Sequence, residues 1–256
     1  MLLFKDITEQ RKMENQLLET SKMAELGIIG SSIAHELNNP IAGMTSFLQL
    51  IKMDLSPKDD CWEDISEMEL AAKRCKEIIE NLLGFARKQE SEGEHVDLFE
   101  VVTQAVQISE LQTRAKGLTV ELPQKVNGIF INGNFNQLTQ AVQNILKNAL
   151  EACMERMEKD TGYRAKIDCK ITRKNDAITM TISDNGPGIP KEIQSKIFNP
   201  LFTTKASGLA AGLGLTVAFK IIAEHNGRLE ISSRLGRGTT ARISFLTGPS
   251  SLDLKS

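Results

Sequence analysis

The chain has 256 residues, of which 41% are hydrophobic and 25% carry a charge. This composition suffices for one or two globular domains and excludes an intrinsically disordered protein. A formal net charge of −2 gives no electrostatic reason to expect a nucleic-acid partner. None of the four cysteines belongs to a Cys-x-x-Cys pair, so we expect neither a structural zinc site nor a disulfide framework, and a cytoplasmic location fits. No apolar run reaches the roughly 20 residues that span a bilayer, so we expect no membrane contact from this segment.

The first third of the chain carries the pattern of two long helices. Apolar residues recur at intervals of three and four from Leu26 to Leu55, as an amphipathic helix requires. Helix-breaking residues fill positions 56–60, and a second amphipathic pattern runs from Ile65 to about Lys88. Two helices with one apolar face each leave a seam uncovered. We therefore expect a helical hairpin that pairs with a second copy in a four-helix bundle, which makes the chain a homodimer.

A histidine on the first helix has neighbours that change its chemistry. The helical spacing places His35 opposite the centre of the apolar stripe, so its imidazole should face water. Glu36 is adjacent, Asn39 lies one turn further on, and Pro40 removes a backbone donor and bends the helix. For a lone histidine the ordinary interpretation is a solvated side chain, and a purely structural kink is the alternative explanation of the proline. Next to a carboxylate, however, a neutral imidazole is a good nucleophile near pH 7.

The character of the sequence changes after Arg87, where the polar segment 88–94 indicates a linker. Beyond it, helices are expected at 96–109, 134–157 and 214–225. Strands are expected at 118–122, 128–131, 165–172, 177–183, 228–233 and 239–245. Strands and helices in separate runs predict a mixed sheet with helices on one face, which is an α/β sandwich.

Three segments of this second domain are suited to binding a nucleotide. Asn144 and Asn148 share one helix face at i and i+4, and asparagine oxygens are ligands that Mg²⁺ accepts. Asp184 stands at a strand end, where its carboxylate can accept a hydrogen bond from an exocyclic amine, and the two glycines that follow let the backbone approach a flat ring. Residues 208–215 are a glycine-rich turn before a helix, whose amides can bind phosphate. Each segment alone is also explained as an exposed helix face or an ordinary turn.

The order of these segments resembles one family. Residues 35–40, with the sequence His-Glu-Leu-Asn-Asn-Pro, resemble the phosphoacceptor box of the sensor histidine kinases. The asparagine box, first glycine box, phenylalanine-rich lid and second glycine box of the same family resemble, in this order, residues 144–148, 184–188, 197–205 and 208–214. The resemblance covers about residues 20 to 246. It implies an ATP-dependent protein histidine kinase of a two-component system, in which a dimeric helical hairpin precedes an α/β sandwich ATP-binding domain of the Bergerat fold.

The resemblance also implies roles for individual residues. It makes His35 the nucleophile towards the γ-phosphate of ATP, Glu36 the base, and Asn39 the residue that helps to hydrolyse the aspartyl phosphate of a partner. It makes Asn148 the Mg²⁺ ligand and Asp184 the reader of adenine. The other nucleotide-binding residues that it implies are Asn144, Lys147, Gly186, Gly188, Lys205, Gly212, Leu213 and Gly214. ATP and Mg²⁺ are the implied cofactors, and the receiver domain of a response regulator is the implied partner.

The resemblance divides the chain into four parts. Residues 1–20 resemble the exit of a PAS sensory domain and its signalling helix, and 21–90 the dimerisation and histidine phosphotransfer hairpin. Residues 95–247 correspond to the catalytic ATP-binding domain, and 248–256 are expected to be a disordered tail. We therefore expect the chain to be the catalytic core of a larger sensor.

Two alternative functions use the same residues. DNA gyrase, mismatch-repair ATPases and heat-shock chaperones share this ATP-binding fold and hydrolyse ATP, with glutamate at the position that matches Asn144. Asparagine is a poor general base, which favours phosphoryl transfer to His35 over direct hydrolysis. The second alternative is a degenerate kinase that serves as a scaffold, because Ala210 and Ala211 replace the glycine and the hydroxyl residue usual in the lid. The presence of the nucleophile, the magnesium ligand and the adenine reader favours the active kinase.

Overall fold

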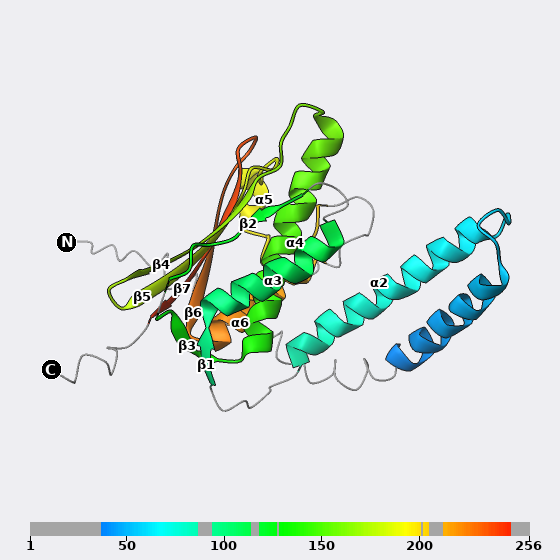
Figure 1. Ribbon diagram of the computed structural model, residues 1–256, viewed down its shortest axis with the longest axis horizontal. Helices are drawn as coiled ribbons and strands as arrows, with labels where there is room; N and C mark the ends of the chain where they lie inside the picture. The colour runs from blue at the N-terminus through cyan, green and yellow to red at the C-terminus, as the bar shows by residue number, and fades with distance from the viewer. Residues whose placement is uncertain are drawn as a thin grey trace, which may run out of the picture. The chain divides into compact units, whose positions relative to one another are not determined.

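The computed structural model describes residues 37–86, 94–113, 118–126, 128–200, 202–204 and 212–246. The chain divides into two compact units, one built around the helices of residues 37–86 and one around the sheet and helices that begin at residue 94 (Figure 1). The PAS-like segment 1–20 and the tail 248–256 lie outside the described residues. Among the helices that are described, none combines the length and the apolar character needed to cross a bilayer.

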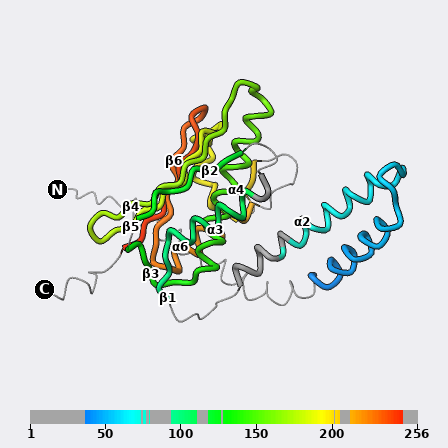
Figure 2. Tube along the Cα trace, in the orientation of Figure 1, coloured from blue at the N-terminus to red at the C-terminus, as the bar shows by residue number. Residues whose placement is uncertain are grey.

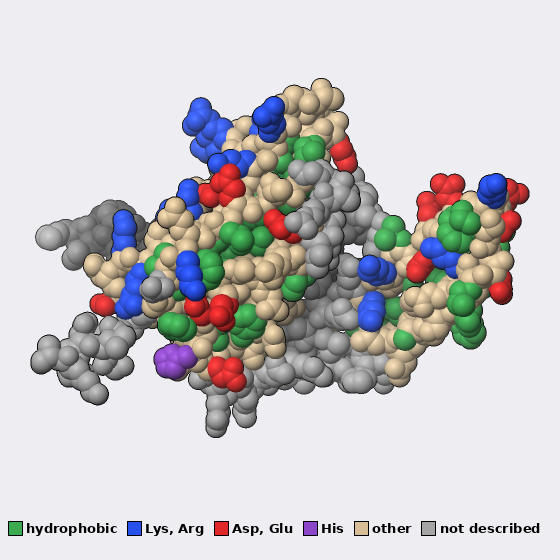
Figure 3. Space-filling view, in the orientation of Figure 1, with side chains coloured by type: hydrophobic (Ala, Val, Ile, Leu, Met, Phe, Trp, Pro, Cys, Tyr) green, Lys and Arg blue, Asp and Glu red, His purple; other side chains and the backbone are tan. Residues whose placement is uncertain are grey.

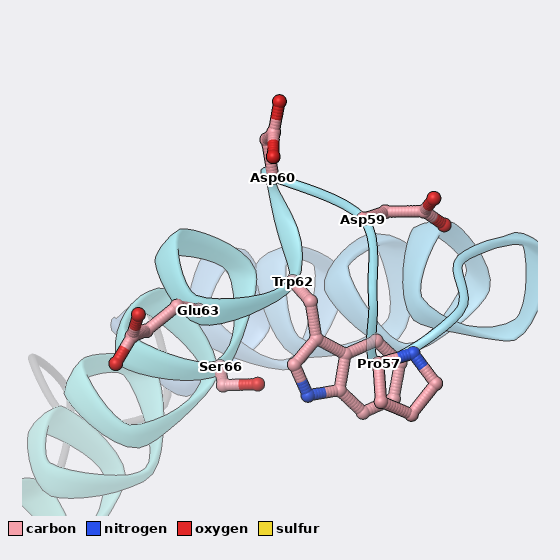
Figure 4. Close-up of a pocket in the computed structure, with 6 residues that line it drawn as sticks. All are labelled: Pro57, Asp59, Asp60, Trp62, Glu63 and Ser66. Atoms are coloured by element: carbon pink, nitrogen blue, oxygen red, sulfur yellow. The ribbon is translucent and has the colours of Figure 1, made fainter.

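The first unit is a helical hairpin, as the apolar spacing predicts. One helix covers residues 37–54 and includes Pro40, and α2 covers Trp62–Ala86. An ion pair of 2.7 Å joins Lys52 to Glu69 across the hairpin. Figure 4 shows the side chains that line an open hollow at the turn, which are Pro57, Asp59, Asp60, Trp62, Glu63 and Ser66. This turn lies at the end of the first helix opposite Asn39.

Much of the apolar surface of the hairpin is exposed in a single chain. The exposed fractions of Met44, Phe47 and Met53 are 59%, 68% and 82%, whereas Leu48 and Ala72 are buried between the two helices. A hairpin can bury only the stripe that faces its own second helix, and exposed apolar patches of this kind mark interaction surfaces. These exposed apolar side chains are a physical reason to expect that a second copy of the hairpin covers them.

The second unit contains two sheets. A five-stranded mixed sheet has the order β2-β4-β5-β7-β6, and β1 pairs with β3 in a separate antiparallel ribbon. The strands are β1 (Glu94–Asp97), β2 (Val120–Glu121), β3 (Phe130–Gly133), β4 (Ile167–Lys174), β5 (Ala177–Asp184), β6 (Gly227–Arg234) and β7 (Gly238–Leu246). β2 runs parallel to β4, and the remaining neighbours in the large sheet are antiparallel.

Helices cover one face of the large sheet (Figures 1 and 2). They are α3 (Leu98–Thr113), α4 (Phe135–Lys159) and α6 (Gly214–Glu224), and a short α5 covers Lys191–Gln194. Along β5, Ile178, Met180 and Ile182 are buried while the residues between them are partly exposed, which is the alternation of a strand covered on one face. The core between sheet and helices includes Leu98, Leu138, Leu146, Ile222 and Phe245. The predicted α/β sandwich is confirmed.

Charged side chains of both signs are interspersed on the surface of the second unit (Figure 3). Ion pairs join Lys170 to Asp168 at 2.6 Å and Arg228 to Glu230 at 3.0 Å. These pairs lie on the strands, with the lysine and arginine side chains mostly exposed. Such pairs contribute at most about 1 kcal/mol each to stability, so the fold depends on the core rather than on them.

Several element boundaries differ from the predictions by a few residues, and two of the differences have local reasons. The predicted strand 128–131 begins two residues later, because Gly128 has a φ of +73° in the left-handed region and cannot continue an extended strand. Val96, predicted as the start of a helix, belongs to β1 and pairs with Ile131. α5 was not predicted, since four residues give no periodic signal.

Candidate nucleotide-binding site

One face of α4 connects the start of α6 with the loop after β5. Asn144 adjoins the first residue of α6, because a Cβ atom added to Gly214 would lie 3.7 Å from Asn144 Oδ1. Two turns along α4, Ala152 contacts the loop, since a Cβ atom added to Gly186 would lie 3.1 Å from Ala152 Cβ. Asn148 is exposed midway between them, and the helical rise gives roughly 12 Å from residue 144 to residue 152. Three segments that are distant in sequence thus meet along one helix.

Asp184 ends β5 with its carboxylate held by two backbone amides. Its Oδ1 accepts hydrogen bonds from the amides of Gly186 at 2.8 Å and Thr239 at 3.2 Å. Among the described residues both of these bonds go to Oδ1, which leaves Oδ2 to accept from another donor. Burial raises the pKa of the Asp184 carboxyl, and the two amides partly offset that rise. A half-buried acceptor with one oxygen fixed is suited to the amino group of a flat ring.

Two glycines allow this loop to lie directly on the turn between β6 and β7. Gly188 has a φ of +75°, and a Cβ atom there would collide with the carbonyl group of Arg234. Gly238 has a φ of +108°, and a Cβ atom there would collide with the carbonyl oxygen of Asp184. Sequence reasoning singled out Gly188 but missed Gly238, which lies in a glycine-rich turn that carries no nucleotide motif.

The side chain of Asn185, which the sequence analysis did not select, is engaged by the segment that follows α4. Asn185 Oδ1 accepts hydrogen bonds from the Lys166 amide at 2.8 Å and from the Tyr163 hydroxyl, and Nδ2 donates to the Arg164 carbonyl at 2.8 Å. Burial raises the pKa of Tyr163, so its hydroxyl stays protonated and donates. Asn185 therefore ties the loop after β5 to residues 163–166.

Arg156, also missed by the sequence analysis, holds the same loop from α4. Its Nη1 donates to the carbonyl oxygens of Asn185 at 2.8 Å, Gly186 at 3.1 Å and Gly236 at 3.2 Å. Its guanidinium carbon lies 4.7 Å from the ring centroid of Tyr163. In sequence, an arginine near the end of a helix looks like an ordinary basic residue of the last turn, so no pattern marks it.

The other end of the site is the start of α6. Gly212, with a φ of +64°, and Leu213 directly precede this helix. Thr216 Oγ1, in the first turn of α6, donates to the Phe198 carbonyl at 3.0 Å, and the ring of Phe198 lies 5.3 Å from that of Phe219. These contacts fasten the beginning of the predicted lid to α6. The first amides of an α-helix lack intrahelical partners and favour an anion.

The polar groups that meet here fit an adenine nucleotide. Asn144 Nδ2 is buried without a hydrogen-bond partner in the described part of the chain. An orphaned donor of this kind is costly unless a ligand atom satisfies it, and it lies beside the helix start that would face phosphate. Asp184 Oδ2 offers an acceptor at the opposite end. The donor end and the acceptor end match the phosphate and the base of a nucleotide.

The remaining predicted residues are placed as follows. Lys147 is exposed on α4 next to Asn148, and Asn39 is exposed on the helix of residues 37–54. His35, Glu36 and Lys205 lie outside the described residues, as do Ala210 and Ala211. Within the second unit, α4 therefore connects Asn144, beside Gly214 at the start of α6, with the loop that follows Asp184.

Comparison with known proteins gives two domain families. Residues 29–91 match the family described as the His Kinase A (phospho-acceptor) domain, and residues 133–249 match the Histidine kinase-, DNA gyrase B-, and HSP90-like ATPase family. Sporulation kinase A of Bacillus subtilis strain 168 is 32% identical over 245 residues, which cover 95% of this chain and 38% of that protein. The signal transduction histidine-protein kinase AtoS of Escherichia coli strain K12 is 30% identical over 253 residues, which cover 97% of this chain and 39% of AtoS. The chain thus spans well under half the length of these relatives.

Solved structures share the fold. Full-length ShkA in complex with AMPPNP superposes with a TM-score of 0.69 at 17% identity, covering 86% of this chain and 46% of ShkA. The histidine kinase ThkA in complex with the response regulator TrrA gives a TM-score of 0.62 at 22% identity, covering 96% of this chain and 69% of that one.

The two matched families occur in the order that the sequence motifs predict, and the similarity to kinases extends over almost the whole chain. Residues 29–91 accordingly form a phospho-acceptor domain of the His Kinase A family, and residues 133–249 form an ATP-binding domain of the histidine kinase-, DNA gyrase B- and HSP90-like family.

Proposed function

We propose that this chain is the catalytic part of a sensor kinase that phosphorylates its own His35 from ATP and passes the phosphoryl group to an aspartate of a receiver domain. The observation that carries the proposal is the alignment of Asn144, Asn148 and the Asp184 loop along one face of α4, in a domain that follows a phosphoacceptor-type hairpin. A plain ATP hydrolase has no need of that hairpin. It also needs a base to activate water, and the amide of Asn144 is a poor one.

The transfer proceeds by displacement at the γ-phosphorus. Nε2 of the neutral His35 imidazole forms the new P–N bond as the bond between the γ-phosphorus and the bridging oxygen breaks, and ADP leaves with that electron pair. Glu36 accepts the proton from Nδ1, which leaves the phosphorylated ring neutral. Because phosphoryl transfer requires little covalent chemistry from the protein, catalysis rests on positioning and charge neutralisation.

The nucleotide lies along α4 in this proposal. Asp184 accepts a hydrogen bond from the adenine amino group, and Gly186 and Gly188 let the loop pack closely against α4 and the turn between β6 and β7, which holds Asp184 in place. At the other end, Asn144 Nδ2 donates to the polar tail of the nucleotide, which lies at the start of α6. The phosphate neighbours are Lys147, Lys205, Gly212, Leu213 and Gly214. Asn148 would hold Mg²⁺, which neutralises phosphate charge when bound.

The hairpin is the proposed site of assembly. Its exposed apolar side chains, including Met44 and Phe47, are buried when two hairpins form a four-helix bundle, so we propose a homodimer. A receiver domain of a response regulator is the proposed partner, by analogy with the complex of ThkA and TrrA. The free thiols, two of them exposed at Cys61 and Cys75, suit the reducing cytoplasm in which we place the chain.

Labelling with γ-³²P-ATP and Mg²⁺ tests the proposal. Wild type is expected to acquire label that acid removes and base does not, and His35→Ala is expected to acquire none. The matched control is His95→Ala, which removes an exposed histidine on β1 and is expected to label like wild type. Free phosphate released without labelled protein would instead identify an ATPase, and unlabelled protein that still binds nucleotide would identify a scaffold.

Asn39→Ala is expected to abolish dephosphorylation of a receiver domain while leaving labelling of His35 unchanged. Asn39 is exposed, so its amide is available to orient water in this proposal, and the substitution leaves the residues of α4 unchanged. Loss of phosphate from a phosphorylated receiver is measured with wild type, with Asn39→Ala and with Ser46→Ala, an exposed change on the same helix. Equal rates in all three proteins would remove Asn39 from the phosphatase reaction.

A further inference from the structure

We infer that Arg156 is a positioning residue for adenine recognition: it fixes the peptide whose amide group holds the Asp184 carboxylate. The inference rests on the proposed function, since it assumes that adenine occupies the position beside Asp184. Arg156 lies in the last turns of α4, two turns beyond Asn148.

The connection from guanidinium to carboxylate passes through a single residue. The carbonyl oxygen of Gly186 accepts a hydrogen bond from Arg156 Nη1 at 3.1 Å, and the amide of the same glycine donates to Asp184 Oδ1 at 2.8 Å. Arg156 Nη1 also donates to the Asn185 carbonyl at 2.8 Å, and this carbonyl belongs to the same peptide group as the Gly186 amide. Rotation of that peptide would withdraw the amide from Oδ1.

The guanidinium itself is held in one orientation. The ring of Tyr163 lies beside it, and the Tyr163 hydroxyl donates to Asn185 Oδ1. Arg156 Nη1 also reaches the Gly236 carbonyl, while the Gly236 amide donates to the Pro187 carbonyl at 2.7 Å. The loop after Asp184 is therefore clamped between α4 and the turn of β6 and β7. A planar guanidinium that stacks on a ring suits this task, and a lysine ammonium does not reproduce it.

Arg156 acts through the shape of the loop. Among the described residues, its hydrogen bonds go to carbonyl oxygens and not to the Asp184 carboxylate. With Oδ1 tied to two amides, the carboxylate cannot rotate, and Oδ2 keeps one direction. Without the Arg156 guanidinium, the Asp184 carboxylate is no longer held in this orientation. The contacts of Asn144, at the phosphate end of α4, are unchanged. The expected defect is therefore specific to the amino group of adenine.

The full chain with Arg156→Lys is tested by titration with ADP and with inosine diphosphate, which lacks the amino group. Wild type is expected to prefer ADP. The variant is expected to bind ADP about tenfold more weakly, as the loss of one hydrogen bond to a charged group implies, and inosine diphosphate within about twofold of wild type. The matched control is Arg173→Lys, which alters an arginine on β4 that donates to the Gly128 carbonyl at 2.8 Å and not to the loop after Asp184. The control is expected to keep the preference for ADP.

The outcomes separate this inference from the proposed function. A purely structural role for Arg156 would weaken both nucleotides equally, which would overturn the inference. If Asp184→Asn abolishes the preference for ADP and folded Arg156→Lys retains it, the inference alone is wrong. If both variants retain it, Asp184 does not read adenine, and that part of the proposed function is wrong too. Should circular dichroism show that Arg156→Lys does not fold, Arg156→Gln, whose amide can still donate to one carbonyl, is titrated in its place.

Discussion

Asp184→Asn is expected to weaken ADP binding by roughly 10- to 100-fold and, at the same time, to make the nucleotide-free protein more stable. Binding is weakened because the carboxylate oxygen that accepts from the adenine amino group is replaced. In asparagine, that position holds either a neutral oxygen, which is a weaker acceptor, or an amino group, which cannot accept. A hydrogen bond to a charged group contributes about 1.5–3 kcal/mol, which sets this range.

The gain in stability follows from the burial of the carboxylate. Asparagine Oδ1 can still accept from the amides of Gly186 and Thr239, so the change removes a half-buried charge and keeps its hydrogen bonds. Burial raises the pKa of Asp184 in the folded state above its unfolded value of about 3.9. The folded protein therefore binds this proton more tightly, and its stability falls as pH rises from the unfolded to the folded pKa and stays low above it.

Urea unfolding of the nucleotide-free proteins measures this effect. At pH 7 Asp184→Asn is expected to have the higher free energy of unfolding, and the difference is expected to shrink as the pH is lowered from the raised pKa of folded Asp184 towards the pKa of the unfolded chain. Asp176→Asn, which neutralises an exposed carboxylate in the turn between β4 and β5, serves as control and should show no such trend. A variant less stable than wild type at pH 7 would contradict the hydrogen-bonding pattern described for Asp184.

Gly188→Ala is expected to reduce both stability and ADP affinity, far more than Gly236→Ala does. Both glycines have left-handed backbones, with φ of +75° and +77°, so both substitutions incur the same conformational cost of roughly 1–2 kcal/mol. Only at Gly188 does the added methyl group meet backbone, the carbonyl of Arg234, while a Cβ atom on Gly236 has nothing within 4 Å. The collision is expected to cost about 1–3 kcal/mol more and to displace the loop that carries the Asp184 contacts.

The pair of variants is compared by urea unfolding and by titration with ADP. Gly236→Ala is expected to lose stability and keep its affinity, because its backbone amide and carbonyl are unchanged. Equal losses in the two variants would mean that the left-handed conformation alone explains the need for glycine, and that the loop can move away from the turn at no cost.

The sequence predicted the parts of the site that have a regular pattern or a contiguous motif. Periodicity located α4 and β5, and the order of motifs placed Asn144, Asn148 and Asp184 in one site. It did not reveal Arg156 or Gly238, because each acts on backbone groups of a distant segment. Arg156 reaches Gly236, 80 residues away, through a carbonyl oxygen that every residue type possesses. Contacts to the backbone place no demand on the identity of the partner, so no pair of residue types signals them.

The alignment along α4 makes this helix intolerant of changes in its length. Each added residue advances the chain by 1.5 Å and turns it by roughly 100°. An insertion between Asn148 and Ala152 would therefore swing the half that carries Arg156 a quarter turn or more away from the half that carries Asn144. The residues at the two ends of α4 would then face different directions and could not contact the same bound ligand. Length polymorphism among variants of this chain should accordingly be confined to the turns, such as that at residues 160–162, and be missing from the span between positions 144 and 156.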